Sequence, residues 1–548
     1  MCFTLTKSES IVKMNLLNIQ KFIKNIRKGE KIMKSEYTII FISPEMIIPE
    51  LEETALGANF RGGLGILAGD ICEGLAKQKI KAIAITPLYS RHWMTKENID
   101  YGKTPAKEVF KAKPLAHFGE ASILKTDRAG IDHYGILQKE IFDELYTADR
   151  GNRLSQEVLL GHVSVAVIKQ LKIKPDIIWI QEGHSSIIVP VAKEDAYFKN
   201  TKYLFTTHTP VPEGMEKFFG DRFHELKIHE KYHYVFVKDG VIDMTRASMI
   251  LADKVNAVSE EHFEQTKKMF PEFINKITWV TNGSSRDLWL SPCIKKYKDI
   301  NFVQLEKIHL KNKNELCEFL QKKSGILLDI QKPILSWVRR IAWYKQQNPM
   351  LAPIIDAICA ERNEIVSTPL GRLNGLGFQV FGAGQAHESD STCLGWMADF
   401  HNWMTDKQKG KSIFLPQYGM ELLQRAAWGS DVWFSCPLPG MEACGTSEMR
   451  ATENGVPVLT TYGGGAREYI EEYNMVTGEG NGFFIEPYQP ISAYYKLKFI
   501  SDLYYDYILN GNNRWLMLKH HTFKTGKKLD VLPMIEKYEK IFEELLLK

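Results

Sequence analysis

Short apolar runs alternate with amphipathic stretches along most of the chain. The first apolar run is Thr38–Ser43, and the next is Lys81–Ile85. Between them lie the glycine-rich segment Gly57–Gly65 and the helical pattern Ile66–Gln78. This order predicts a βαβ unit, the building block of a parallel sheet with helices on both faces. Further strands of this sheet are predicted at Ile177–Ile180, Tyr203–Thr207, Lys254–Val258 and Ile277–Val280.

A second series of the same kind follows a predicted helix at Lys311–Lys323. Its strands are predicted at Ile334–Val338, Gln379–Phe381, Ser412–Leu415, Val432–Ser435 and Val456–Thr461. A chain of 548 residues exceeds one ordinary core. We therefore predict two doubly wound α/β domains over residues 34–300 and 301–490. Residues 491–548 are predicted to form helices that pack back, and residues 1–33 form a basic leader that stands apart from this fold.

Composition narrows the class of protein. The net charge of +4 is small for this length and gives no reason to expect a nucleic-acid partner. The eight cysteines contain no CxxC pair, which argues against a disulfide framework and a zinc site. No apolar run approaches the length of a membrane span. The sequence thus predicts a cytoplasmic protein with no metal, no membrane partner and no nucleic-acid partner.

Polar residues follow several of the predicted strands directly. Residues beyond the carboxyl ends of parallel strands gather in one crevice, where such sheets bind ligands. His184 and His208 each follow an apolar strand, and both are candidates for contact with a sugar. Either histidine alone fits a structural role at a strand end equally well.

Two cations, Arg340 and Lys345, lie just after another predicted strand. An arginine fork and a lysine point charge suit a phosphate or diphosphate. A solvated basic helix face is the alternative interpretation of this pair.

The segment Pro437–Arg467 combines a carboxylate with two glycine-rich turns. Glu442 precedes the turn Gly445–Ser447, and the triplet Gly463–Gly465 leads to a second predicted helix at Arg467. Amide groups at a helix N-terminus bind anions, so both turns are candidate anion sites. Glu442 is a candidate for holding sugar hydroxyls or stabilising an oxocarbenium-like centre, and a helix-capping carboxylate is the alternative.

Seven motifs follow one another in the chain: GANFRGGLGILAGD (57–70), QEGHS (181–185), FTTHTPVPEG (205–214), TNG (281–283) with Trp289, RRIAWYK (339–345), FLPQY (414–418) and EACGTSEMRATENG (442–455). In this order they resemble the α-glucan phosphorylases, above all the short bacterial and archaeal type. The resemblance implies a GT-B architecture, in which two Rossmann-like domains face each other across a cleft and the C-terminal helices pack on the N-terminal domain. It implies a retaining transfer that releases glucose 1-phosphate from α-1,4-glucan (glycogen, starch or maltodextrin) and phosphate, with pyridoxal phosphate as cofactor. A homo-oligomer is compatible with it.

The resemblance also assigns roles to individual residues. It implies catalytic roles for His208, Arg340, Lys345 and Glu442. It implies that sugar and phosphate are held by Gly62, Gly63, Gly65, His184, Asn282, Cys444 and Gly445. It implies that the cofactor is surrounded by Trp289, Arg339, Tyr418, Thr446 and Arg450.

Position 450 departs from the family pattern. The lysine that forms the Schiff base with pyridoxal phosphate falls at Arg450, and a guanidinium does not form that imine. The following segment GVPVLTTYGGGAREYI (455–470) resembles nucleotide-sugar glycosyltransferases such as glycogen synthase. The second glutamate of their E-x7-E pattern also falls at position 450. Two alternatives to the phosphorylase therefore stand: a nucleotide-sugar glucosyltransferase, and a noncatalytic glucan-binding relative.

Overall fold

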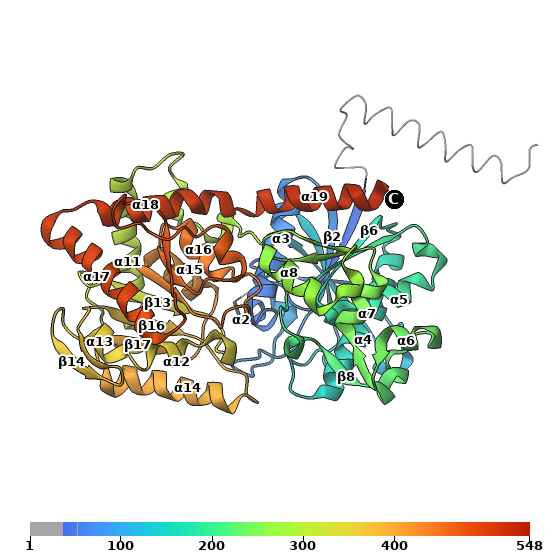
Figure 1. Ribbon diagram of the computed structural model, residues 1–548. Helices are drawn as coiled ribbons and strands as arrows, with labels where there is room; N and C mark the ends of the chain where they lie inside the picture. The colour runs from blue at the N-terminus through green and yellow to red at the C-terminus, as the bar shows by residue number, and fades with distance from the viewer. Residues whose placement is uncertain (1–36, 52, 548) are drawn as a thin grey trace, which may run out of the picture.

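The computed structural model describes residues 37–51 and 53–547, and the predicted leader over residues 1–33 lies outside them. These residues form two lobes that lie side by side (Figure 1). The first lobe is built on a sheet with the strand order β12-β11-β7-β6-β1-β2-β5-β4-β3. Its strands are β1 Thr38–Ile42, β2 Lys81–Pro87, β3 Lys107–Ala112, β4 Ala121–Arg128, β5 Ile131–Leu137, β6 Ile177–Gln181, β7 Lys202–Thr206, β11 Lys254–Ala257 and β12 Ile277–Trp279.

The second lobe is built on a parallel sheet with the order β17-β16-β13-β18-β19-β20. Its strands are β13 Ile334–Val338, β16 Gln379–Ala383, β17 Ser412–Leu415, β18 Val432–Ser435, β19 Val458–Thr460 and β20 Gly482–Phe484. Two small antiparallel sheets add β8 Lys217–Phe219, β9 Val237–Lys238, β10 Val241–Asp243, β14 Ile365–Thr368 and β15 Gly371–Asn374.

Helices cover both sheets (Figure 1). They are α2 Glu53–Ala58, α3 Gly63–Lys77, α4 Arg150–Gln170, α5 Ile188–Lys193, α6 His233–Phe236, α7 Met244–Leu251, α8 Glu260–Met269, α9 Arg286–Trp289, α10 Pro292–Lys295, α11 Phe302–Ser324, α12 Gln347–Leu351, α13 Ile355–Cys359, α14 Ser391–Asn402, α15 Met420–Gly429, α16 Ser447–Glu453, α17 Pro490–Asn510, α18 Arg514–Gly526 and α19 Val531–Leu547. Within the described residues, none has the length and apolar content that crossing a bilayer requires.

The expected parallel arrangement is present in both sheets, and the first sheet has in addition an antiparallel edge, because β4 runs antiparallel to both β3 and β5. One expectation about these elements was wrong. The helix expected at Arg467 is only a 3-10 turn over Gly464–Glu468. The predicted strands are present, with ends that differ by at most two residues. Continuous apolar runs mark buried parallel strands well, and the half-exposed edge strands lack that signal.

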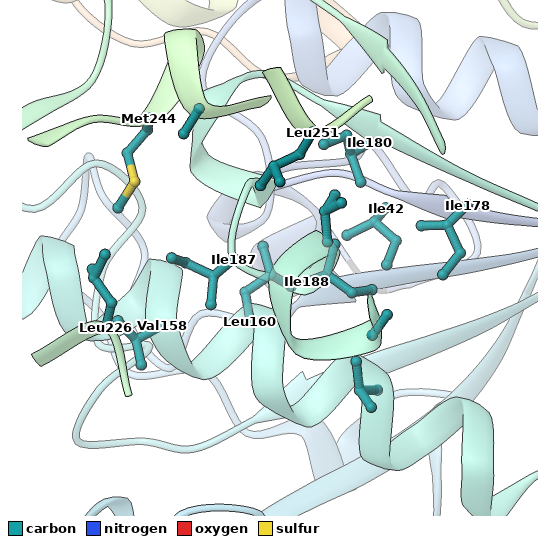
Figure 2. Close-up of a cluster of buried hydrophobic side chains, with 14 of the residues drawn as sticks. Ile42, Val158, Leu160, Ile178, Ile180, Ile187, Ile188, Leu226, Met244 and Leu251 are labelled. Atoms are coloured by element: carbon teal, nitrogen blue, oxygen red, sulfur yellow. The ribbon is translucent and has the colours of Figure 1, made fainter. Parts of the chain in front are cut away.

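The core of the first lobe lies between its sheet and the helices that follow the strands. Figure 2 shows Ile42 of β1 and Ile178 of β6 facing Leu160 of α4, and all three are at most 2% exposed. Burying each such side chain contributes about 1.5–3 kcal/mol, so this packing fixes where the strand ends lie.

The C-terminal helices return to the first lobe, as predicted. Figure 1 shows α18 over the second lobe and α19 over the first. In the packing of α19 on α3, a Cβ at Gly74 would lie only 2.6 Å from Ile535 Cγ1. Tyr538 packs on Trp179 of β6, with ring centroids 4.4 Å apart. The chain therefore crosses between the lobes twice, which restricts their relative movement.

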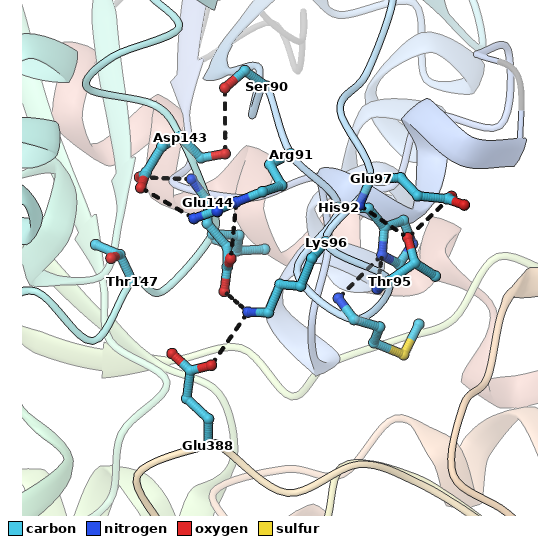
Figure 3. Close-up of polar contacts among 12 residues, drawn as sticks. Ser90, Arg91, His92, Thr95, Lys96, Glu97, Asp143, Glu144, Thr147 and Glu388 are labelled. Atoms are coloured by element: carbon cyan, nitrogen blue, oxygen red, sulfur yellow. Dashed lines mark hydrogen bonds and ion pairs between the residues drawn. The ribbon is translucent and has the colours of Figure 1, made fainter.

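Polar contacts also join the lobes. In Figure 3, Lys96 of the first lobe lies between Glu144 of the same lobe and Glu388 of the second. Its Nζ is 2.6 Å from Glu144 Oε1 and 3.3 Å from Glu388 Oε2. Elsewhere, Ser259 Oγ donates to Ala443 O at 2.6 Å. These contacts hold the two sets of strand-end loops against each other.

Candidate active site

A cleft of about 690 Å³ lies where loops of the two lobes meet. It is lined by loops from both sheets, as the strand-end rule predicts. Arg340 and the Gly62 turn, which come from different lobes, line this same cleft. The residues predicted from the sequence that line it are Gly62, Gly63, His184, His208, Asn282, Arg339, Arg340, Lys345, Tyr418, Glu442, Cys444, Gly445, Thr446 and Arg450.

Gly65 and Trp289 were also expected at the ligand, but neither is among the residues that line the cleft. Gly65 is a packing position, because a Cβ there would lie 2.6 Å from Phe60 Cβ. Trp289 is 0% exposed, and its indole lies behind Arg450 with 4.6 Å between the guanidinium carbon and the ring centre. Both residues shape the wall of the cleft from behind.

Glu442 is held by two cations of the second lobe. Its Oε2 is 2.6 Å from Arg339 NH2 and 2.6 Å from Lys345 Nζ. Burial favours the neutral carboxyl, but Lys345 and Arg339 outweigh it and lower the pKa of Glu442 to about 2. Glu442 is therefore an anion at any working pH. Arg339 and Lys345, expected at cofactor and phosphate, line the cleft and bind this carboxylate.

Arg340 has a different environment. Its side chain is half-buried and lines the cleft, and its phenol partner is Tyr344. Among the described residues, Arg340 forms no ion pair with a carboxylate. A guanidinium that lines a cleft without a carboxylate partner is suited to bind an anionic ligand.

The surroundings of Arg450 show whether the residues present fit pyridoxal phosphate, which the resemblance places there. It is 4% exposed, lies against Trp289, and has NH1 3.5 Å from Thr446 Oγ1. The lysine that lines the cleft in the described part of the chain is Lys345, and its amine binds Glu442. No amine therefore stands where an imine would form, and the residues do not fit covalently bound pyridoxal phosphate.

The turn before α3 brings backbone amides to the cleft. Gly62 is the N-cap of α3 and makes no side-chain cap hydrogen bond. Glu45 Oε2 accepts from the backbone amides of Arg61 at 2.7 Å and Gly62 at 3.3 Å. The amides that follow, from Gly63, belong to the first turn of α3, whose N–H groups have no partner within the helix. The Glu45 carboxylate lies close to this turn, with Oε2 2.9 Å from the Cβ position of Gly65.

His208 is fixed by Gln181, the last residue of β6, and by Glu182, which follows it. Its Nε2 lies 2.9 Å from Gln181 Oε1, and its backbone N–H donates to Glu182 Oε1 at 2.5 Å. Burial, with a smaller contribution from His262, lowers the pKa of His208 to about 3. The imidazole is therefore neutral near pH 7. Glu182 has φ +58°, a strained conformation for this residue type, and its hydrogen bonds maintain it.

His184 belongs to an ion-pair cluster in the first lobe. Its Nε2 is 2.9 Å from Glu216 Oε2, which also accepts from Arg153 at 2.7 Å. Glu157 joins His184 and Glu216 to bring three metal-ligand atoms within 4.8 Å of one another. Because the Arg153 guanidinium contacts His184 and Glu216 in that same space, a cation there would meet a like charge.

The triplet Gly463–Gly465 is not an open anion site. The backbone N–H of Gly464 donates to the Glu261 carboxylate of the first lobe. A Cβ at Gly464 would lie 2.3 Å from Glu442 O, and one at Gly465 would lie 2.2 Å from Cys444 Sγ. The glycines thus let the chain pack closely behind the Glu442 loop, which corrects the expectation of two anion sites there.

Asn282 and Cys444 join the lobes rather than standing free. Asn282 Nδ2 donates to Cys444 O at 3.3 Å. Sequence reasoning missed several other lining residues. Glu45 follows β1 by three residues, so its place beyond a strand end could have identified it. The arginines on α4 lie within a helix and could not be identified in this way. The missed residues are Glu45, Tyr146, Arg150, Arg153, Glu182, Glu216, Trp343 and Tyr344.

The arrangement favours one kind of chemistry over another. Hydrolysis of a glycoside uses a carboxylic acid that is kept protonated to give a proton to the leaving group. Glu442 is held as an anion. Burial raises the pKa of Glu182, which also lines the cleft, but its Oε1 accepts from the His208 N–H and the Thr209 hydroxyl. A leaving group that is already an anion needs no such acid, and Arg340 with the α3 amides suits it.

The fold is defined by these two facing sheets and their shared cleft: it is the GT-B fold. The catalytic domain of starch synthase IV from Arabidopsis thaliana, solved with ADP and acarbose, matches 94% of this chain and 100% of its own with a TM-score of 0.73. The two sequences are 16% identical. This likeness confirms the GT-B architecture expected from the sequence motifs.

Sequence comparison finds relatives of two kinds. The family model of the starch synthase catalytic domain matches residues 39–276. Glycogen phosphorylase of Aquifex aeolicus is 26% identical over 80% of this chain and 75% of its own. Maltodextrin phosphorylase of Thermococcus litoralis is 28% identical, and the match spans 76% of this chain but only 60% of that relative. Glycogen synthase of Treponema denticola is 22% identical over 76% of this chain and 82% of its own. The chain is thus related to glycosyltransferases of both kinds.

Proposed function

We propose that the protein is a retaining glucosyltransferase that extends α-1,4-glucan from a nucleoside-diphosphate glucose. The observation that supports this proposal most is Arg450, an arginine at the position where the resemblance to the phosphorylases places the imine-forming lysine. An arginine there excludes covalent pyridoxal phosphate, while Arg340 and the α3 amides still offer an anion site. The solved neighbour, which is bound to ADP and acarbose, supports the same choice.

In this reaction the bond between glucosyl C1 and the diphosphate oxygen breaks, and its electron pair leaves with the diphosphate. Arg340 and the α3 amides stabilise that negative charge. A glucan hydroxyl attacks C1 from the same face, and its proton passes to the departing phosphate oxygen. Glu442 remains ionised throughout and holds sugar hydroxyls near the positive charge that develops at C1.

A second candidate function is phosphorolysis of the glucan to glucose 1-phosphate without a covalent cofactor. It is favoured by the motif RRIAWYK, with its five-residue spacing of Arg340 and Lys345, and by the two phosphorylase relatives. Here inorganic phosphate would occupy the position of the departing diphosphate.

The test supplies the purified protein with a maltooligosaccharide and, in separate reactions, labelled ADP-glucose, UDP-glucose or glucose 1-phosphate. We expect label to enter the glucan from a nucleotide sugar. The E442Q variant should lose at least about 100-fold in rate, because the variant leaves Arg339 and Lys345 without their carboxylate. E264Q, which changes an exposed carboxylate of α8, is the matched control.

Incorporation from glucose 1-phosphate alone would replace the proposal with the second candidate. A protein that binds glucan and transfers from none of the three donors would be a noncatalytic relative, and the proposal would be wrong.

A further inference from the structure

The cations that line the cleft are not equally neutralised. Glu216 forms ion pairs with two of them in the first lobe, and Glu442 with two in the second. Within the described residues, Arg340 and Arg450 remain without an ion pair. The full set of arginines and lysines that line the cleft is Arg150, Arg153, Arg339, Arg340, Lys345 and Arg450.

Arg450 is the more buried of the two unpaired arginines. It is 4% exposed, and its polar contact in the described structure is the 3.5 Å hydrogen bond to Thr446 Oγ1. The face of the guanidinium packs on Trp289. A buried cation without a carboxylate is costly, since the desolvation is not offset.

Three acidic groups, Asp70, Glu448 and Glu453, act on Arg450 without forming an ion pair with it. Glu448 is close to another cation, with Oε1 3.5 Å from Arg339 NH1. Burial raises the pKa of Asp70 to about 7 and holds the pKa of Glu453 well above its usual range. Asp70 accepts from Trp289 Nε1 and from the backbone N–H of Ser285. These contacts fix Asp70 behind the indole, so the open side of Arg450 faces the cleft.

Arg450, Arg340 and Tyr418 all line the cleft. Burial raises the pKa of Tyr418 to about 12, and the charges of both arginines oppose this effect. Thr446, the partner of Arg450, is also 3.9 Å from the Cβ position of Gly63, at the start of α3. Two guanidinium groups and the N-terminus of α3 therefore line the same cleft, and Thr446 lies between Arg450 and the start of α3.

We propose that Arg450 binds the second phosphoryl group of the donor, next to the one held by Arg340. This inference rests on the proposed function. Glucose 1-phosphate has one phosphoryl group, whereas a nucleoside-diphosphate glucose has two adjacent ones, each with a negative charge. The planar fork of a guanidinium matches phosphate oxygens, and its charge persists even when buried. Arg450 is thus a specificity-determining residue for diphosphate donors.

The experiment measures binding by calorimetry, so it does not depend on turnover. Orthophosphate, pyrophosphate and ADP are titrated into the wild-type protein, R450Q, R450K and the control R425Q, which changes an arginine of α15 paired with Glu421. We expect R450Q to weaken pyrophosphate and ADP by about 10- to 100-fold, the effect of one charge-assisted contact, and orthophosphate by less than about twofold. R450K should recover part of the loss, because it restores charge without the fork.

An equal loss for orthophosphate and pyrophosphate in R450Q would assign Arg450 to the same phosphate as Arg340 and overturn the proposal. Unchanged binding of all three ligands would show that Arg450 is a packing residue on Trp289, and it would also overturn the proposal. Glucan binding checks that R450Q is folded. If the wild type transfers glucose but R450Q does not lose more affinity for pyrophosphate than for orthophosphate, only this inference fails. If R450Q shows that selective loss but the wild type transfers no glucose, only the proposed function fails.

Discussion

The two glycine-rich turns at Gly62–Gly65 and Gly463–Gly465 look alike in the sequence and differ in the structure. The first begins a helix of 15 residues and borders the cleft. The second begins a single 3-10 turn and packs behind Glu442. A carboxylate reaches both turns, from Glu45 at the first and from Glu261 at the second.

The comparison shows that a glycine cluster in the sequence can have two different structural reasons. At Gly63, a Cβ would meet only Thr446 Oγ1 at 3.9 Å, so the missing side chain leaves room for a ligand. At Gly464, a Cβ would meet the backbone oxygen of Glu442 at 2.3 Å, so the missing side chain leaves room for the protein itself. Glycine marks a close approach in both turns, and only the structure identifies the approaching group.

The largest effect is expected for G464A. The position has φ +55°, which strains an alanine, and the added Cβ overlaps Glu442 O. We expect unfolding free energy to fall by about 2–4 kcal/mol. Glucosyl transfer should fall with it, because the Glu442 loop must shift. Chemical denaturation and a transfer assay measure the two effects.

The matched control for this change is G410A. Gly410 has φ +80° but no atom within 4 Å of its Cβ position, so alanine there meets strain without overlap. We expect a loss of only about 1 kcal/mol and unchanged transfer. Equal behaviour of the two variants would mean that contact with the Glu442 loop is unimportant.

At the other turn, G63A should act on the ligand and leave stability intact. The residue is helical and its Cβ has space, so alanine is tolerated or slightly stabilising. The methyl group enters the region of the anion, and we expect the dissociation constant for pyrophosphate to rise about tenfold. Calorimetry gives the affinity, and a thermal melt gives the stability.

G395A provides the comparison for G63A. Gly395 lies in α14 with no atom within 4 Å of its Cβ position, and so shares the helical setting without lining the cleft. It should match G63A in thermal stability and the wild type in affinity. A G63A protein that melts much earlier than G395A would show that the first turn is a packing site as well.

Much of this fold was predictable from apolar runs alone. The expected strand Ile334–Val338 is present with the same ends, because a parallel strand covered on both faces must be apolar throughout. The antiparallel strands β3 to β5 were not predicted. In β4 the burial alternates with exposed and half-buried residues, and no glycine-rich helix start follows to mark a βαβ unit.

The candidate site was predictable where it follows strands and not where it depends on partners. Arg340 and Glu442 were expected in one cleft, and both line it. The ion pair between Lys345 and Glu442 could not be predicted from the sequence, because ion pairing depends on how two loops meet. The contact between Glu261 of the first lobe and the Gly464 N–H could not be predicted either, because it also depends on how the two lobes meet.

The smallest effect is expected for removal of the Glu261 carboxylate. It is half-buried and accepts one backbone N–H, so E261A should lower the unfolding free energy by only about 1 kcal/mol. E261Q keeps an acceptor oxygen and should recover most of that loss, while E264Q on the same helix should match the wild type. Affinity for pyrophosphate should stay unchanged in all three variants, because the Gly463–Gly465 turn binds protein and not substrate. A higher affinity for pyrophosphate in E261A would show instead that Glu261 blocks an anion site at the Gly463–Gly465 turn. Both turns would then be anion sites, and they would differ only in that a carboxylate of the protein occupies the second one.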